Sequence, residues 1–530
     1  MTRAALNRLP TEIVHLILGH LGFNCSGKLL PEPPNAYIRA DRQESDQPSW
    51  YSLKLQTLLS LCFVTRRLCE IVQPILYHEF MLGYGDSWRS DVYAWDGRLI
   101  SFMRTVAQRR DLAALVKRIF VHPYLLACFD ERQTTIECAC SMFYMCGNCT
   151  SNFFIHEPKP RQYIGEDEAR AALQELARIS GLEDLVSLSA ANLLTVLIAQ
   201  LPNLEHCSLQ VVPYPDEIVR SAGLHATRTT RLPIKTLDLS LRASATDGWH
   251  SERFDIGRCT RALLDASPCL ETLNLHMCRG ISDTESLSLP NLKHLHLTFS
   301  RLSERSLQSL LSTCSGLQSF FYEASTHFNR LSCTYHFRLS SAIKHLARHR
   351  ASLQSLHLDL RARGFISPAQ EDRISFTLRD FTSLTHLFLN IDEFHSHWIA
   401  ADPDPAGDQN LLVHLLPFSI VSLHLAGHIT DELPRLESSL LGLAHATLHG
   451  QFPTLEEVRW DESEKLADEA QVRSVFADAG VSFEYDTWPL SSSTLGDVPG
   501  PLGPSYVDPW YNPHSRQGNR LGNDAYAPLF

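Results

Sequence analysis

The sequence lacks an excess of positive charge and lacks long apolar runs. Its 530 residues carry 47 Lys and Arg against 59 Asp and Glu, a formal net charge of −12 at pH 7. A nucleic-acid-binding protein needs a concentrated basic surface, and an anionic membrane attracts basic segments. The longest apolar stretches, such as LLSLCFV at 58–64, are too short to span a bilayer. We therefore expect no nucleic-acid partner and no membrane.

Secretory and catalytic motifs are missing as well. The first predicted helix carries Glu12 and His15 where a signal peptide needs an apolar run. The fourteen cysteines are therefore expected to be reduced thiols of a cytoplasmic or nuclear protein. The sequence contains no G-x-S-x-G elbow and no G-x-x-x-x-G-K phosphate-binding loop. These absences predict a protein that is not an enzyme and uses no cofactor.

What is present begins with a short amphipathic helix in LNRLPTEIVHLILGHL, residues 6–21. Pro10 suits a first helical turn, where its missing N–H would have no partner. A lone helix of this length is marginal in water, so its apolar stripe must be buried against something. The residues of this stripe are Leu9, Ile13, Leu16, Ile17 and Leu21.

A polar, Pro-containing loop is predicted over 22–50, and helical periodicity returns over 51–80. There we expect Pro74 to end the helix. From about residue 113 a different pattern follows, in which an apolar residue is followed by two more at +3 and +5. The nine clearest copies begin at Leu204, Ile234, Leu270, Leu292, Leu317, Leu353, Leu384, Ile420 and Leu455, and an earlier copy begins at Val116.

Helical stretches separate these copies, at a spacing of about 22 to 36 residues. A recurring strand-plus-helix unit is typical of a leucine-rich repeat solenoid, in which stacked units bury a continuous core. Cys278 and Cys314 fit the cysteine-containing subtype of this repeat, as small buried core residues. The predicted fold class is α/β: a small N-terminal helical domain, then an irregular leucine-rich repeat solenoid of strand-plus-helix repeats, and a disordered or loosely packed C-terminal tail.

The pair LPTEIVHLILGHL and LLSLCFVTRRLCEIVQPILYHEF resembles the F-box. The family pattern matches Leu9, Pro10, Glu12, Ile13, Ile17, Leu18 and Leu21, followed by Leu58, Leu61, Val64 and Arg67. An F-box followed by leucine-rich repeats is an arrangement found in fungal proteins of this kind. Here some thirty residues separate the first two helices, where a typical F-box has a few.

This resemblance implies a substrate receptor of a Skp–cullin–F-box ubiquitin ligase, in which catalysis belongs to the partners. The F-box would dock the Skp adaptor of a cullin–RING ligase, and the repeats would hold a protein substrate. The implied adaptor-binding residues are Leu9, Pro10, Ile13, Ile17, Leu21, Leu58, Leu61 and Val64, some of which must form the helical core instead. The alternatives are a ligase-independent interaction scaffold and, less favoured, a metal-dependent enzyme.

The resemblance also divides the chain into domains. Residues 1–80 would be an F-box-like helical domain with the 22–50 insertion, 81–112 a helical linker, and 113–486 the repeats. A Cys-rich insertion covers 130–160, and a Pro- and Gly-rich tail covers 487–530. Four thiols of the insertion, Cys138, Cys140, Cys146 and Cys149, have an atypical spacing for zinc, so we expect reduced thiols and no metal, with a zinc site left open.

Because strand residues alternate between faces, the residues flanking the strand leucines are expected on the solvent-facing side of the repeats. Seven of these twenty-seven positions are His, none is Lys and one is Arg. Such a face is poorly suited to a phosphorylated segment, and it would gain positive charge as the pH falls through the imidazole range. The predicted substrate-binding residues are His276, His296, Phe321, His357, Phe388, His424 and Arg459.

Overall fold

The computed structural model describes most of the predicted repeats and two parts of the N-terminal region. The described residues are 9–19, 50–80, 98–121, 166–179, 181, 189–211, 218–226, 231–241, 255–276, 278, 280–281, 287–324, 337–360, 376–390, 405–427, 433–461 and 465–486. Leu21, the four cysteines of the 130–160 insertion and the tail 487–530 lie outside them, as does nearly all of the 22–50 insertion.

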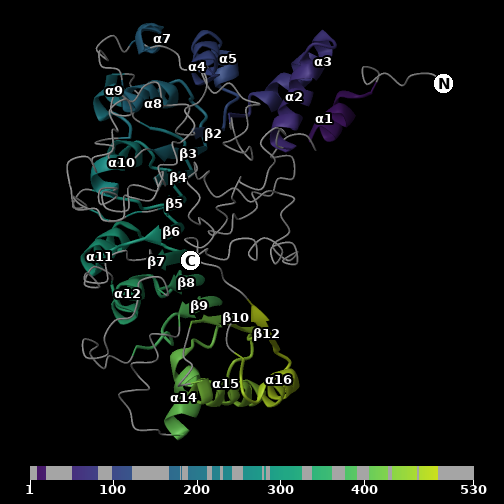
Figure 1. The fold of residues 1–530 in the computed structure, drawn as a ribbon, viewed down its shortest axis with the longest axis vertical. Helices are drawn as coiled ribbons and strands as arrows, with labels where there is room; N and C mark the ends of the chain where they lie inside the picture. The colour runs from purple at the N-terminus through teal and green to yellow at the C-terminus, as the bar shows by residue number, and fades with distance from the viewer. Residues whose placement is uncertain are drawn as a thin grey trace, which may run out of the picture.

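The described chain forms a mixed α/β fold around one twelve-stranded parallel sheet, in which each strand pairs with the next strand in the sequence. Figure 1 shows the strands stacked in chain order, with the helices from α8 to α14 along one side of the stack. The strands are β1 (Glu79–Phe80), β2 (Arg118–Val121), β3 (His206–Val211), β4 (Thr236–Leu241), β5 (Thr272–His276), β6 (His294–Ser300), β7 (Ser319–Ala324), β8 (Ser355–Asp359), β9 (His386–Asn390), β10 (Ser422–Ala426), β11 (Glu457–Asp461) and β12 (Ser482–Asp486).

Each of the ten predicted copies forms a strand, from β2 at the Val116 copy to β11 at the Leu455 copy. The first apolar residue of each copy is buried, and so are the two apolar residues that follow it in the strand, as with Leu292, Leu295 and Leu297. Cys278 and Cys314 are buried in the same core, which confirms their predicted packing role. Strands β1 and β12 were not predicted, because neither carries the repeating apolar spacing.

Helices supply the other wall of this core, with the apolar faces of α8, α10, α11 and α12 packed in it. The helices after the N-terminal bundle are α4 (Arg98–Gln108), α5 (Arg110–Ala113), α7 (Glu166–Ile179), α8 (Ala190–Ala199), α9 (Ser221–Ala226), α10 (Ile256–Asp265), α11 (Glu304–Thr313), α12 (Leu339–Leu346), α14 (Pro405–Leu415), α15 (Leu433–Leu448) and α16 (Glu469–Asp478). No helix among the described residues is long and apolar enough to cross a membrane.

The first three helices form a bundle with a core of its own. These are α1 (Thr11–Gly19), α2 (Trp50–Cys62) and α3 (Arg66–Leu76), and their core contains Val14, Leu18, Leu58, Leu68, Ile71 and Val72. The predicted helix over 51–80 is therefore two helices, because the Thr65 side chain accepts from the Leu68 N–H and starts a new one. Pro74 lies inside α3, two residues before its end, so the expectation that it ends the helix was wrong.

Neighbouring units are tied together by the polar residue that stands directly before the first apolar residue of a copy. Asn291 Nδ2 donates to the Pro268 carbonyl at 2.8 Å, and Ser352 Oγ donates to the Leu317 carbonyl at 2.8 Å. Asn203, Ser383, Ser419 and Thr454 make the equivalent bond to the preceding unit. The side chain thus donates a hydrogen bond to a loop carbonyl that has no partner among the strand-to-strand hydrogen bonds of the sheet.

A second tie is a row of alternating charges just before the first strands. Glu205 contacts both Lys117 (3.0 Å) and Lys235 (2.9 Å), and Glu271 contacts Lys293 at 3.0 Å. These pairs are partly exposed, so each contributes little to the free energy of unfolding. Their alternation nevertheless favours the observed strand register, since a one-residue shift would separate every pair.

One buried ion pair joins α14 to α15. Arg435 donates from Nε and Nη2 to the two carboxylate oxygens of Asp408, at 2.8 and 2.7 Å. The helices approach so closely that a Cβ at Gly442 would collide with the Gln409 carbonyl. The ion pair therefore sits in a tightly packed helix–helix contact.

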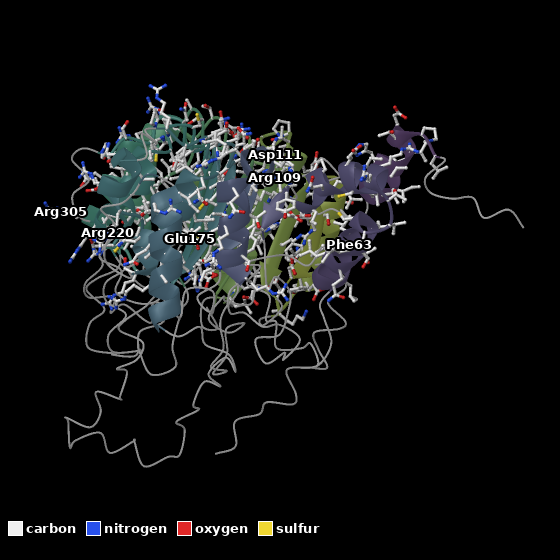
Figure 2. The ribbon with its side chains drawn as sticks, turned by 90° about the horizontal axis from the view of Figure 1, so that it is seen from above. Phe63, Arg109, Asp111, Glu175, Arg220 and Arg305 are labelled. Atoms are coloured by element: carbon white, nitrogen blue, oxygen red, sulfur yellow. The ribbon has the colours of Figure 1, made fainter. Side chains whose placement is uncertain are left out.

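Arg435→Ala is expected to lower the free energy of unfolding by about 3 kcal/mol, because it leaves the Asp408 carboxylate buried without its partner. Arg104→Ala, which breaks the exposed pair with Glu175, is the matched control and should cost less than about 1 kcal/mol. Glu175 is labelled in Figure 2. Urea denaturation of the two variants measures the difference. An equal loss of unfolding free energy in the two variants would show that the buried pair of Arg435 and Asp408 stabilises the fold no more than an exposed pair does.

Candidate functional site

Helix α1 presents an apolar cluster to solvent. Ile13 and Ile17 are each 43% exposed and Leu16 is 66% exposed, while Val14 and Leu18 point into the bundle core. The predicted stripe of α1 is therefore the outer face of the helix. We call Ile13, Leu16 and Ile17 the α1 cluster.

A second apolar cluster lies where α2 ends and α3 begins. Phe63 is 81% exposed and Val64 is 61% exposed, and Leu59, one helical turn earlier, is also exposed. Phe63 is labelled on these N-terminal helices in Figure 2. We call Leu59, Phe63 and Val64 the corner cluster. Large exposed apolar groups concentrated on one small bundle are typical of a protein-binding surface.

Arg67 fixes the start of α1 against the start of α3. Its Nη2 donates to the Leu9 carbonyl at 2.6 Å and to Thr11 Oγ1 at 3.3 Å. Because Leu9 and Arg67 are 58 residues apart, this contact closes the bundle across the long 22–50 insertion. Both exposed clusters are thereby carried on one packed unit.

The eight predicted adaptor-binding residues divide by exposure. Pro10, Ile13, Ile17 and Val64 are exposed, Leu9 and Leu61 are half buried, Leu58 is in the bundle core, and Leu21 lies outside the described residues. Sequence reasoning missed Phe63, the most exposed large apolar side chain among those of the bundle that the structure describes. The signal was available, since Phe63 and Val64 directly precede the Thr65 cap at which α2 and α3 separate.

The outer face of the sheet carries a column of rings across β6 to β9. The strand register aligns His296, Phe321, His357 and Phe388, one residue on each strand. The Phe321 and His357 rings stack with centroids 3.9 Å apart, and the His357 and Phe388 rings stack at 3.8 Å. His296 meets Phe321 edge-on at 6.2 Å. The structure thus brings four of the predicted substrate-binding residues into one ring column.

Phe388→Ala is expected to cost about 3 kcal/mol of unfolding free energy, since it removes a buried ring and the His357 stack. His386→Ala, on the same strand but exposed, should cost less than about 0.5 kcal/mol. Chemical denaturation of both variants measures the difference. A small loss for Phe388→Ala would mean that the column adds nothing to folding.

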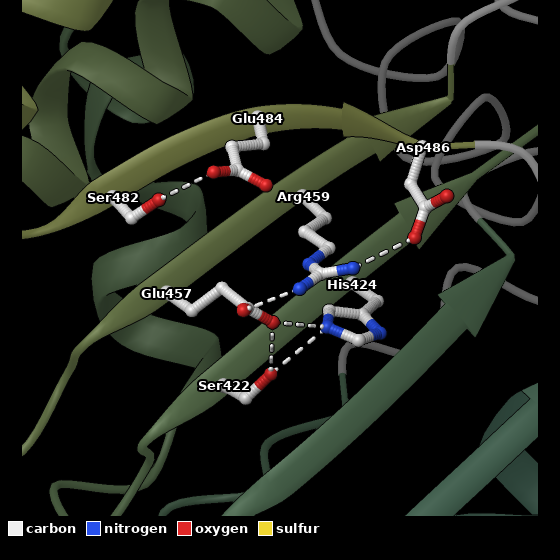
Figure 3. A network of polar contacts seen from close by, with 7 residues as sticks. All are labelled: Ser422, His424, Glu457, Arg459, Ser482, Glu484 and Asp486. Carbon is white, nitrogen blue, oxygen red and sulfur yellow. Dashed lines mark hydrogen bonds and ion pairs between the residues drawn. The ribbon is translucent and has the colours of Figure 1, made fainter. Parts of the chain in front are cut away.

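The row continues at β10 and β11 into a polar network, which Figure 3 shows from close by. His424 Nε2 lies 2.8 Å from Glu457 Oε1, and Ser422 Oγ donates to the same oxygen at 3.1 Å. Arg459 donates to Glu457 Oε2 at 2.7 Å and to Asp486 Oδ2 at 2.9 Å. His424 and Arg459, both predicted substrate-binding residues, are therefore held by neighbouring carboxylates.

This network has the residue types of a nucleophile–base–acid triad but not the geometry. Ser422 Oγ lies 2.9 Å from His424 Nε2, the same nitrogen that contacts Glu457. A triad needs the hydroxyl and the carboxylate on opposite ring nitrogens. One nitrogen then accepts the hydroxyl proton, while the carboxylate holds the N–H of the other and stabilises the imidazolium. The contacts therefore hold the side chains in place and assemble no proton relay.

Burial governs the protonation of this face. It lowers the pKa of His296 to about 4 and that of His276 to about 3, and it lowers the pKa of His424 although Glu457 opposes the shift. At Glu457 burial raises the pKa, but hydrogen bonds from Arg459 and His424 outweigh it and bring the pKa to about 2. These imidazoles therefore gain charge at lower pH than the sequence led us to expect.

His276 differs most from its expected environment. It is fully buried, with Nδ1 2.9 Å from Thr298 Oγ1, and it lies one row beyond the ring column. The other members of that outer row whose side chains the structure describes are buried as well; they are Thr298, Glu323, Asp359, Asn390, Ala426 and Asp461. Alternation predicted the face to which these side chains point but not their burial.

Within the described part of the chain, no group of three or more His, Cys, Asp or Glu residues is placed to hold a metal ion. The possible zinc ligands Cys138, Cys140, Cys146 and Cys149 fall outside that part. No known protein-family model matches the chain, and no curated protein matches it either.

Proposed function

We propose that this chain is a non-catalytic substrate receptor of a Skp–cullin–F-box ubiquitin ligase. In this proposal α1 to α3 form the F-box that docks the Skp adaptor. The strands and helices from β1 to β12 form a leucine-rich repeat solenoid that holds a protein substrate. The partners carry out ubiquitin transfer, and this chain raises the local concentration of substrate lysines near the loaded ubiquitin carrier.

The α1 cluster and the corner cluster carry the proposal. A helical bundle that served only to close one end of the sheet would turn its apolar side chains toward the sheet core. Instead Ile13, Leu16, Ile17, Phe63 and Val64 are exposed, while the bundle keeps a separate core of its own. Exposed apolar groups on a preformed helical surface suit a partner's groove.

The sheet supports the second half of the proposal. Its strictly sequential parallel order leaves one face to the helices and aligns the side chains of the other face in rows. The ring column and the polar network of Ser422, His424, Glu457 and Arg459 lie on that second face. A repeated, rigid row of side chains is the type of surface that repeat proteins use for binding.

Co-purification tests the function directly. The full-length chain, expressed with a tagged Skp adaptor, is expected to elute with it as a 1:1 complex and to bring the cullin with it when cullin is added. Failure of the wild-type chain to bind the adaptor would overturn the ligase assignment and leave an interaction scaffold.

A further inference from the structure

Two half-buried cysteines of the N-terminal bundle lie against each other. Cys62 is the last residue of α2, one helical turn after the core residue Leu58, and it packs against the bundle core. Cys69 is the fourth residue of α3, and its N–H donates to the Thr65 carbonyl at 2.9 Å. The two thiols are free and share a hydrogen bond. The turn between α2 and α3 thus holds two sulfurs in contact.

The other described cysteines are placed differently. Four of them lie in the core of the repeats, where a buried thiol is inert; they are Cys207, Cys259, Cys278 and Cys314. Cys269 is exposed. Cys62 and Cys69 combine a thiol partner with partial exposure, so a small reagent can reach them in the folded chain.

The contact between the two thiols sets the order in which they react. Burial, the charge of Cys69 and the hydrogen bond to Cys69 raise the pKa of Cys62 to about 11. Cys62 therefore keeps its proton at neutral pH and donates it to the Cys69 sulfur. Because the thiolate is the nucleophile in thiol–disulfide exchange, the first attack falls to Cys69.

We propose that Cys62 and Cys69 are a modification site, at which a small disulfide such as oxidised glutathione converts the two thiols into a reversible disulfide bond. The Cys69 thiolate attacks one sulfur of the small disulfide, whose S–S bond breaks, and the first leaving thiolate takes up the Cys69 proton. Cys62 then attacks the Cys69 sulfur of this mixed disulfide, and its proton goes to the second leaving thiolate. Two cysteines are oxidised, and one small disulfide is reduced to two thiols.

The new bond would close a ring of residues 62–69 that contains Phe63 and Val64 of the corner cluster. In the reduced chain the N–H groups of Phe63 and Val64 donate to the Ser60 and Leu61 carbonyls, at 3.1 and 3.2 Å. A disulfide holds its sulfurs about 2 Å apart, closer than a hydrogen bond between thiols does. The end of α2 and the start of α3 would therefore approach each other, and the corner cluster would change shape.

The consequence for binding rests on the proposed function. If the corner cluster docks the adaptor, oxidation should weaken adaptor capture by about tenfold, because a displaced apolar side chain no longer fits the partner's groove. The formation of the bond itself does not depend on that function.

Peptide mapping of the full-length chain tests the bond. The chain is equilibrated with mixtures of oxidised and reduced glutathione, alkylated and digested. We expect the peptides that carry Cys62 and Cys69 to be joined by a disulfide in a chain that stays monomeric on a non-reducing gel, and to separate on reduction. Cys269→Ser, the matched control, should form the bond like the wild type, whereas Cys62→Ser and Cys69→Ser should not.

The exposed Cys269 shows whether the oxidant has acted. A wild-type chain that carries glutathione on Cys269 but has no bond between Cys62 and Cys69 would overturn the proposal. A mixed disulfide that persists on Cys69 would overturn it as well, since Cys62 would then have failed to displace it.

Adaptor capture is measured separately, on the reduced and the oxidised wild type and on the double variant Cys62→Ser/Cys69→Ser. About tenfold weaker capture by the oxidised wild type, with no change in the double variant, is the expected result. Equal capture by both forms of the wild type would overturn the effect on the corner cluster. Bond formation without adaptor capture by either form would contradict the proposed function and leave the modification site in place.

Discussion

Replacing Ile13 and Phe63 together by aspartate should abolish capture of the Skp adaptor, with at least a hundredfold loss of affinity. The two side chains are the exposed apolar groups that the proposed interface would bury, one from the α1 cluster and one from the corner cluster. Burying an unpaired carboxylate at each position would add a desolvation cost to the lost apolar contact. Pull-down and calorimetry against purified adaptor measure the effect.

The same double variant should remain folded, since neither residue belongs to the bundle core. Leu448→Asp is the matched control, because Leu448 is a comparably exposed leucine on α15, far along the chain from the bundle. Full adaptor binding by the Ile13/Phe63 variant, with the control also binding, would place the interface elsewhere. Loss of binding in the control as well would indicate a global effect of added charge.

Lowering the pH from 7 to 5 is expected to reduce the free energy of unfolding by about 2 kcal/mol for each of His276 and His296. The pKa of each imidazole in the folded state, about 3 and about 4, lies below the ordinary value of 6.5 because the rings are desolvated. The unfolded chain therefore takes up a proton near pH 6.5 while the folded chain does not. Stability is complete above that pH and is lost progressively as the pH falls toward the folded-state pKa.

Urea titrations at pH 7, 6 and 5 measure this loss, and His296→Gln should remove about 2 kcal/mol of it. His345→Gln is the control, since this ring lies on α12 beside Glu304, outside the sheet face. An unchanged pH dependence in His296→Gln would show that His296 is protonated normally in the folded protein. The same measurement tests whether charge on this face changes within the physiological range.

The sequence predicted the repeated strands because their signal is periodic. An apolar residue followed by two more at +3 and +5 must put all three on the core side, and Leu292, Leu295 and Leu297 do so. The helix stripe of α1 was also predictable, but its partner was not. Ile13 and Ile17 lie on the same stripe as Leu9, yet the bundle core is built from Val14 and Leu18.

Other features had no local signal. β12 ends the sheet with SFEYD, where Lys465 lies over the Tyr485 ring at 3.6 Å and Arg473 donates to the Phe483 carbonyl. These contacts come from residues 10 to 20 positions away, so no spacing rule reveals them. Likewise the burial of His276 depends on its surroundings and not on its place in the strand. The alternation of side chains along a strand predicts the face to which each side chain points. Its exposure depends on what the rest of the fold packs against it.

The side-chain bonds from Asn291, Ser352 and their four equivalents each join a unit to the one before it. A chain pulled from its two ends should therefore give way in small steps, because among the described residues each of these bonds reaches only the preceding unit. The nine copies from Leu204 to Leu455 begin 22 to 36 residues apart, so each step among them should release about 80 to 130 Å of extended polypeptide. A substrate bound across many strands would link several units. A force that pulls on the substrate would then have to unfold these units together and not one at a time.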